Sequence, residues 1–194
     1  MSLVYLAGAI DYAKEDERNG WRGITKLLLE QKQISSFDPS LAFDFHNTGD
    51  LSLVGALRTI NNTAMMNSNY VIVYLPKSVS SVGTVSELLE LAKFNNSSNK
   101  YYASSSVPKV YVVVPDVSDI SQVSAYLLNA IDTTMKLRIG SGALKLAIKE
   151  IIDDHQIYLE KSKPEIDYVW QSEPVTKLAP KPADSYTNKK PSPD

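Results

Sequence analysis

The chain has 194 residues, of which 43% are hydrophobic and 22% charged, a composition typical of one globular domain with its own core. The net charge of −2 gives no reason to expect nucleic acid or an anionic membrane as a partner, and the lack of cysteine excludes disulfides and thiolate chemistry. No basic signal-peptide start is present, and no apolar run approaches the roughly 20 residues that span a bilayer. We therefore expect a soluble, cytoplasmic protein with a small-molecule partner.

Strand and helix patterns alternate along the chain. In chain order they predict a strand at Leu3–Ile10, a helix at Glu15–Lys32, a strand at Ile34–Phe37, a helix at Leu51–Asn67, a strand at Tyr70–Leu75, a helix at Val85–Phe94, a strand at Val107–Val114, a helix at Ile120–Thr133, a brief strand at Leu137–Ile139 and a helix at Gly142–Lys161. Such alternation is typical of βαβ units with right-handed crossovers. We expect a Rossmann-like α/β sandwich, with a parallel sheet of four to five strands flanked by helices.

The composition changes near the end of the chain. From about Pro174 the sequence is rich in Pro, Lys, Ser and Asp and has almost no apolar residues. Such a segment cannot bury enough apolar surface to fold. We expect residues 1–165 to form the domain and 174–194 a flexible tail.

The segment from Asn69 to Glu87 carries the strongest signal for a ligand site. It predicts a buried strand, a loop rich in Ser and the first turn of a helix, with Glu87 at the helix mouth. Ligands of open α/β sheets bind at the carboxyl ends of the strands, and helix N-termini favour anions. Glu87 is therefore a candidate for chemistry on a phosphate-bearing or sugar-bearing molecule. The structural alternative is a capping box, for which Thr84 and Glu87 have the right spacing.

Three segments of the chain carry a family resemblance. They are Tyr5-Leu-Ala-Gly-Ala-Ile, Val71-Ile-Val-Tyr-Leu and Val82-Gly-Thr-Val-Ser-Glu-Leu. Over roughly Leu3 to Ala130 the chain resembles the nucleoside 2-deoxyribosyltransferase family, which includes the nucleoside 5′-monophosphate N-glycosidases.

The resemblance implies a role for two side chains. Glu87 matches the nucleophile that attacks C1′ of the sugar, expels the base and forms a glycosyl ester, which water or a second base resolves. Tyr5 matches the tyrosine that orients this carboxylate. An ordinary strand aromatic is the alternative for Tyr5.

The resemblance also implies how a substrate is held. Ser81 lies six residues before Glu87, where the monophosphate glycosidases carry Ser and the transferases of free nucleosides carry an acid. Ser124 matches a serine that a neighbouring subunit lends to the phosphate, which implies a homodimer or larger, although serines on helix surfaces are common. The residues expected to bind substrate are Gly8, Ala9, Ile10, Ser81, Gly83, Thr84 and Ser124.

One position departs from the family pattern. Asn69 stands where the family has an Asp that contacts the sugar or helps to protonate the leaving base, and an amide cannot act as a general acid. Asp11, at the end of the first predicted strand, is the nearest replacement, with a turn residue as its alternative. Asp38 is a further candidate, although Asp-Pro-Ser is also a common turn. We include Asn69 and Asp11 among the catalytic candidates.

The leading hypothesis is hydrolysis of the N-glycosidic bond of a (deoxy)nucleoside 5′-monophosphate. Alternatives are transfer of deoxyribose between bases, a non-catalytic nucleotide-binding protein suggested by Asn69, and a phosphoribohydrolase of the cytokinin-activating type, whose usual Pro-Gly-Gly loop is absent here. We expect no organic cofactor, because the covalent mechanism needs none and the Gly8 segment is neither a dinucleotide fingerprint nor a P-loop. We expect no metal, because His46 and His155 lack ligands at metal spacing.

Overall fold

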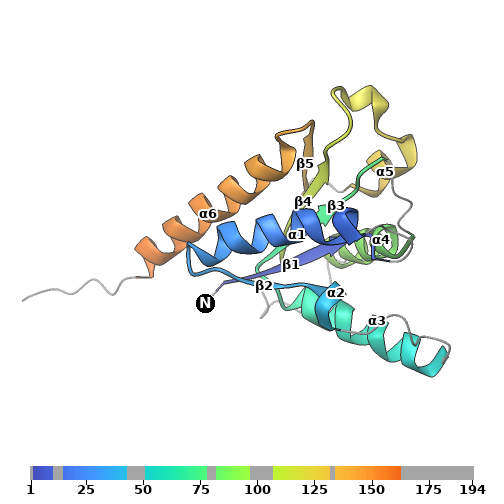
Figure 1. The fold of residues 1–194 in the computed structure, drawn as a ribbon, viewed down its shortest axis with the longest axis horizontal. Helices are drawn as coiled ribbons and strands as arrows, with labels where there is room; N and C mark the ends of the chain where they lie inside the picture. The colour runs from blue at the N-terminus through green and yellow to red at the C-terminus, as the bar shows by residue number, and fades with distance from the viewer. Residues whose placement is uncertain are drawn as a thin grey trace, which may run out of the picture. The chain divides into compact units, whose positions relative to one another are not determined.

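Five parallel strands in the described part of the chain form one sheet, in the order β2-β1-β3-β4-β5 (Figure 1). The computed structural model describes residues 2–10, 15–42, 51–77, 82–96, 107–131 and 134–162. The strands are β1 (Leu3–Gly8), β2 (Ser35–Phe37), β3 (Tyr70–Tyr74), β4 (Lys109–Val114) and β5 (Lys136–Ile139). The expected parallel α/β sandwich is confirmed, including its brief fifth strand.

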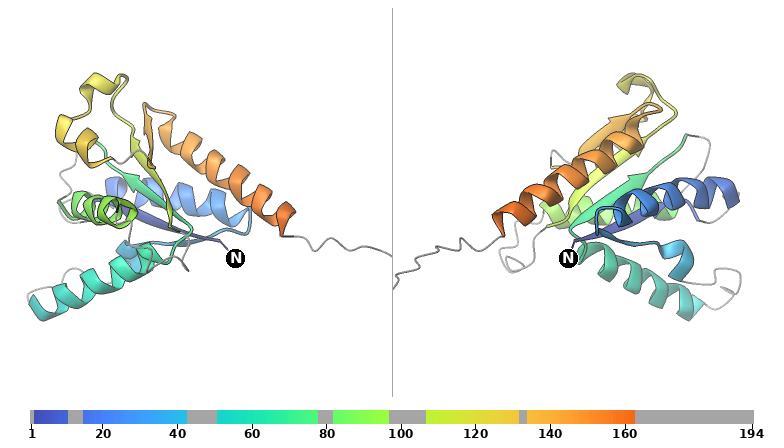
Figure 2. Two further views of the ribbon diagram at one scale, coloured as in Figure 1. Left: turned by 180° about the vertical axis from the view of Figure 1, so that it is seen from behind. Right: turned by 60° about the vertical axis from the view of Figure 1, so that its left-hand side comes forward.

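Helices cover both faces of this sheet. They are α1 (Glu15–Glu30), α2 (Pro39–Ala42), α3 (Leu51–Met66), α4 (Val82–Asn96), the 3₁₀ helix η3 (Ile120–Gln122), α5 (Ala125–Ala130) and α6 (Ala143–Lys161). Figure 1 shows α1 and α6 side by side on one face, and the view from behind in Figure 2 shows α4 and α5 on the other. None of the described helices is long and apolar enough to cross a membrane.

Strand β1 shows why the strands lack an alternating pattern. Tyr5 and Ala7 pack toward α4 and α5, whereas Val4 and Leu6 pack toward α1 and α6. All four side chains are fully buried. A strand that is covered on both faces has no solvent side, so its sequence is a continuous apolar run.

The connections define one special place on the sheet. Neighbouring strands β1 and β3 run parallel, with Gly8 opposite Tyr74, but β1 leads to α1 on one face and β3 leads to α4 on the other. In a doubly wound sheet of this strand order, ligands bind outside the carboxyl ends of the strands where the chain changes face. The fold therefore predicts a ligand site between the ends of β1 and β3.

Some element boundaries differ from those expected. Strand β1 ends at Gly8 rather than Ile10, α4 begins three residues earlier than predicted, and the short helix α2 was not predicted. The predicted helix over 120–133 is divided, because Asp119 caps η3 and Ser124 caps α5. The predicted tail lies outside the described residues.

Candidate active site

The Glu87 carboxylate lies against the middle of strand β1. The phenol of Tyr5 donates a hydrogen bond of 2.8 Å to Glu87 Oε1. Tyr5 is fully buried, and the Phe37 ring of β2 stacks on it with ring centroids 5.6 Å apart. Packing thus fixes the position of the donor, and the donor fixes the carboxylate.

Glu87 projects from the side of α4 that faces the sheet. Thr84, Leu88 and Leu91 on the same side of this helix are buried, with Leu88 and Leu91 in the core. Helix periodicity places an apolar residue at such a position in most proteins, so a carboxylate there is informative.

The capping-box alternative does not describe this geometry. Helix α4 begins at Val82, so Thr84 lies within the first turn instead of capping it, and Glu87 lies in the second turn. The Glu87 side chain instead contacts a strand that is 82 residues away in sequence. It is therefore not consumed in holding its own helix.

Burial changes the acid–base properties of both side chains. Desolvation raises the pKa of Glu87 to about 7, against smaller lowering effects of the Tyr5 hydrogen bond and the Arg22 charge. Desolvation and the adjacent Glu87 raise the pKa of Tyr5 well above its ordinary value. At neutral pH, Tyr5 stays protonated and donates a hydrogen bond to a carboxylate that is partly ionised. Such a group can act as a nucleophile or as a general acid or base.

Sequence reasoning missed Arg22, the buried cation of this region. Its guanidinium donates to the carbonyl oxygens of Gly8 at 2.8 Å and Ala9 at 3.2 Å, at the carboxyl end of β1. Its Nε lies 3.3 Å from Asp38 Oδ1, and both side chains are almost fully buried, at 1% and 6% exposure. A lone Arg in an amphipathic helix is normally solvated, so the sequence around Arg22 does not indicate a buried ion pair. The position of Asp38 at the end of a predicted strand was the one indication of a charged group at this edge of the sheet.

The two glycines of the predicted site have different surroundings. A methyl group at Gly8 would lie 2.6 Å from Cζ2 of Trp21, which itself stacks on Tyr74. Packing against Trp21 therefore requires glycine at position 8. A methyl group at Gly83 would meet no protein atom within 4 Å, so the protein itself does not require glycine there.

Asn69 corrects one expectation about the catalytic residues. It precedes β3 at the amino edge of the sheet, opposite to the edge where Gly8 lies, and its Oδ1 accepts a hydrogen bond of 2.9 Å from the Leu3 amide. The start of a parallel strand lies at the amino edge, whereas the Ser-rich loop follows its carboxyl end. The structure therefore does not bring Asn69 together with Glu87, and its described contact supports the backbone of β1.

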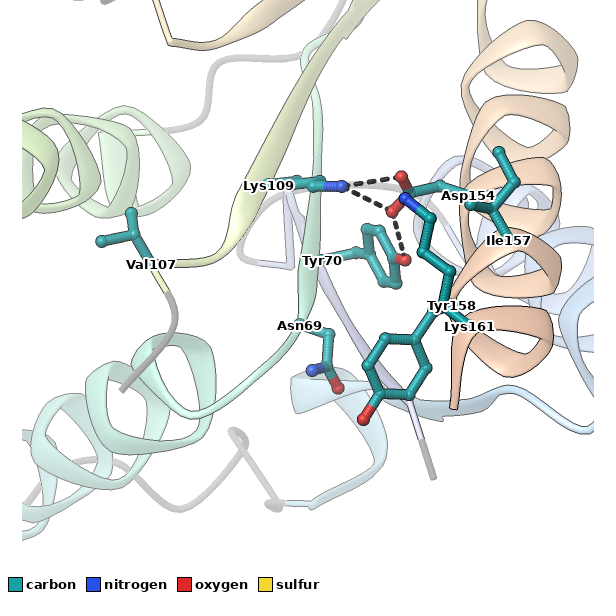
Figure 3. A pocket seen from close by; sticks show the side chains of 8 residues that line it. All are labelled: Asn69, Tyr70, Val107, Lys109, Asp154, Ile157, Tyr158 and Lys161. Carbon is teal, nitrogen blue, oxygen red and sulfur yellow. Dashed lines mark hydrogen bonds and ion pairs between the residues drawn. The ribbon is translucent and has the colours of Figure 1, made fainter. Parts of the chain in front are cut away.

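Figure 3 shows the pocket of about 290 Å³ that Asn69 helps to line. Asp154 of α6 accepts hydrogen bonds from Lys109 at 2.7 Å and from Tyr70 at 2.6 Å in this pocket. These contacts tie α6 to the starts of β3 and β4. The pocket is thus separate from the Glu87 region.

The remaining predicted residues are placed as follows. Ser124 is exposed and caps α5, with its Oγ accepting from the Leu127 amide at 3.1 Å. Ala9 is buried and Ile10 partly buried at the end of β1. Asp11 and Ser81 lie outside the described residues.

Metal ligation has no support in the described part of the chain. No group of three or more His, Asp or Glu side chains there could hold a metal ion. His155 is buried, with its Nδ1 2.9 Å from Ser2 Oγ, and His46 lies outside the described residues. His155 thus has a structural contact within the core.

Two solved structures that resemble this one are a 2-deoxyribosyltransferase from Bacillus psychrosaccharolyticus and a CMP N-glycosidase from Clostridium botulinum. The first has 11% sequence identity and a TM-score of 0.49, over 67% of this chain and 82% of the other. The second has 16% identity and a TM-score of 0.44, over 80% of this chain and 99% of the other. No family model matches the sequence, and no curated protein matches it. At these values the likeness assigns no activity to the chain.

Proposed function

We propose that the protein is an enzyme that hydrolyses the N-glycosidic bond of a (deoxy)nucleoside 5′-monophosphate, with Glu87 as the nucleophile. The observation that carries this proposal is the partly buried Glu87 carboxylate, held at 2.8 Å by the buried Tyr5 phenol beside the switch point of the sheet. A carboxylate that is desolvated and oriented before substrate arrives is suited to attack an anomeric carbon.

The first chemical step forms a covalent intermediate. Tyr5 stays bonded to Oε1, and we assign the attack on C1′ to Oε2 of Glu87. The C1′–Oε2 bond forms as the C1′–N bond breaks. The electron pair of the C1′–N bond leaves with the base, which takes up a proton. Charge develops on the sugar ring in an oxocarbenium-like transition state.

The second step restores the enzyme. Water attacks C1′, the ester bond between C1′ and Oε2 breaks, and its electron pair returns to the carboxylate. The water oxygen becomes the anomeric hydroxyl of the sugar 5-phosphate, and the remaining proton is released. Two displacements at one carbon give net retention of configuration.

The substrate phosphate would be held at the start of α4. The amides of the first helical turn, which includes Gly83 and Thr84, favour an anion, and the preceding Ser81 adds a hydroxyl. Gly8, where β1 ends, and the following Ala9 and Ile10 would form the facing side of the switch point. Ser124 of another subunit remains a further proposed contact.

Release of free base from ribo- and deoxyribonucleoside monophosphates, followed by chromatography, tests the proposal. Glu87→Gln should lower the rate at least about a thousandfold, because the nucleophile is lost. Glu90→Gln is the matched control, since Glu90 lies one turn further along α4 and pairs with Arg58 and Lys93. It should keep the wild-type rate.

Three outcomes would revise this assignment. Full turnover by Glu87→Gln would remove Glu87 as the nucleophile. A new nucleoside in preference to free sugar phosphate, when a second base is added, would show transfer instead of hydrolysis. Monophosphate binding by calorimetry without base release would show a binding protein.

A further inference from the structure

We propose that Arg22, paired with Asp38, is a positioning residue of the Glu87 site: it fixes the backbone at the end of β1 and supplies this site with a buried positive charge. The inference rests on the proposed function. Neither residue touches the reacting atoms in this account, so they act through Gly8, Ala9 and Glu87.

The first part of the inference concerns the backbone. Two nitrogens of one guanidinium donate to two successive carbonyl oxygens, of Gly8 at 2.8 Å and Ala9 at 3.2 Å. Because each peptide unit is planar, these bonds also fix the orientation of the peptide planes that follow Gly8 and Ala9. They engage two carbonyl oxygens that would otherwise present negative charge near an anionic substrate.

The guanidinium is itself held from several sides. Asp38 Oδ1 lies 3.3 Å from Arg22 Nε and accepts two hydrogen bonds from Ser40, from its amide at 2.9 Å and its hydroxyl at 2.6 Å. The Trp21 ring lies 4.7 Å from the guanidinium carbon, at cation–π distance. Arg22 therefore has little freedom to move.

The second part concerns charge. Arg22 stays protonated at any working pH, so its charge is permanent. Its charge lowers the pKa of Glu87, against the larger raising effect of burial. A buried ion pair is weak evidence for stability, because apolar residues of similar size often serve the fold as well. Because Arg22 also binds the carbonyl oxygens at the end of β1, where the fold predicts the ligand site, we assign it a role in the reaction.

The charged and titratable groups around Glu87 come from every neighbouring element. Tyr5 of β1 donates a hydrogen bond to Glu87, the charge of Arg22 on α1 acts on Glu87, and Asp38 after β2 pairs with Arg22. On α4 itself, Glu90 is occupied by Arg58 of α3 and Lys93. Among the described residues, Arg22 is the cation whose charge acts on Glu87, and Asp38 is its ion-pair partner.

Opposite pH shifts distinguish this role from a purely structural one. Arg22→Met should move the rising limb of kcat/KM for base release to higher pH by about one unit, because Glu87 loses its cation. Asp38→Asn should move the limb to lower pH, because the Arg22 charge is no longer balanced. Arg22→Lys should leave the limb near its wild-type position but lower kcat/KM at least about tenfold, since an ammonium lacks the planar fork.

Carbon NMR titration of the Glu87 carboxyl measures the same pKa shifts in the absence of substrate. The Glu87 signal is assigned by its loss in Glu87→Gln. If Arg22→Met does not fold, Asp38→Asn and Arg22→Lys still decide the matter. Two results would overturn the inference if the wild-type protein releases base. One is an Asp38→Asn variant whose activity profile and Glu87 titration do not move along the pH axis. The other is a shift in the same direction for Arg22→Met and Asp38→Asn. A wild-type protein that releases no base would instead overturn the proposed function, and the titration would then report the electrostatic coupling alone.

Discussion

Burial of the Glu87 carboxylate links reactivity to stability. Its pKa rises from the ordinary 4.5 to about 7 on folding, so the folded protein binds this proton more tightly than the unfolded chain does. The free energy of unfolding contributed by this group is therefore highest below pH 4.5 and falls as the pH rises through 7. A glutamine at this position has no such pH dependence and still accepts from Tyr5.

Glu87→Gln should therefore be inactive and more stable than the wild type at high pH. We expect a gain in the free energy of unfolding of roughly 3 kcal/mol at pH 8, and of under about 1 kcal/mol at pH 5. Urea unfolding at both pH values measures it. The same difference at pH 5 and pH 8 would mean that the Glu87 pKa is not raised by burial.

Removal of the Tyr5 hydroxyl tests the contact between Tyr5 and Glu87. Its hydrogen bond lowers the pKa of Glu87, so Tyr5→Phe should move the rising limb of the activity profile above pH 7 and reduce kcat. The ring would still stack on Phe37, so the fold should persist. A lower rate with an unmoved limb would contradict the proposed hydrogen bond to the carboxylate.

The end of β1 depends on close packing between a strand and a helix. Gly8→Ala would push a methyl group into Trp21 and shift the carbonyls that Arg22 holds. We expect a loss of roughly 1–3 kcal/mol in the free energy of unfolding, together with lower activity. Thermal unfolding and base release measure both effects.

Gly83→Ala is the matched comparison within α4. It meets no protein atom within 4 Å and replaces a helical glycine, so it should stabilise the protein by up to about 1 kcal/mol. If substrate approaches this backbone, KM should rise at the same time. A destabilised Gly83→Ala, or a Gly8→Ala variant as stable as the wild type, would contradict the packing described here.

Helix boundaries were harder to predict than strand positions. Strands β1, β3 and β4 are apolar runs that are buried along almost their whole length, and their sequence signal is strong. The segment after Ile120 has apolar residues at helical spacing, but Asp119, Gln122 and Ser124 form local hydrogen bonds that divide it. Such side-chain competition with the helix is visible only once the bonds are known.

The site was predictable only in part. The resemblance to a family pointed to Tyr5 and Glu87, which the structure brings together. Arg22 and Asp38 were not predicted as a pair, because their contact depends on how α1 crosses the ends of β1 and β2. Asn69 was misplaced, because the family pattern assigned it to the site although it precedes β3, at the edge of the sheet opposite to the carboxyl ends of the strands.

Two exposed apolar side chains are surface positions at which the expected assembly can be tested. Ile60 on α3 and Tyr126 on α5 are 47% and 66% exposed. We expect light scattering to give a dimer or larger, and Tyr126→Glu to lower the mass if α5 takes part. A monomer at all working concentrations would remove the proposed contribution of Ser124 from a second subunit.

The double winding of the sheet places the ends of β1 and β3 side by side, and Glu87 is the partly buried carboxylate of α4 that contacts Tyr5. A nucleoside monophosphate with fluorine at C2′ slows both displacements, because fluorine disfavours positive charge on the sugar. Mass spectrometry of the acid-quenched, digested protein should show the sugar phosphate on the peptide that contains Glu87. An intact protein without added mass during turnover, or the added mass on another residue, would contradict the account.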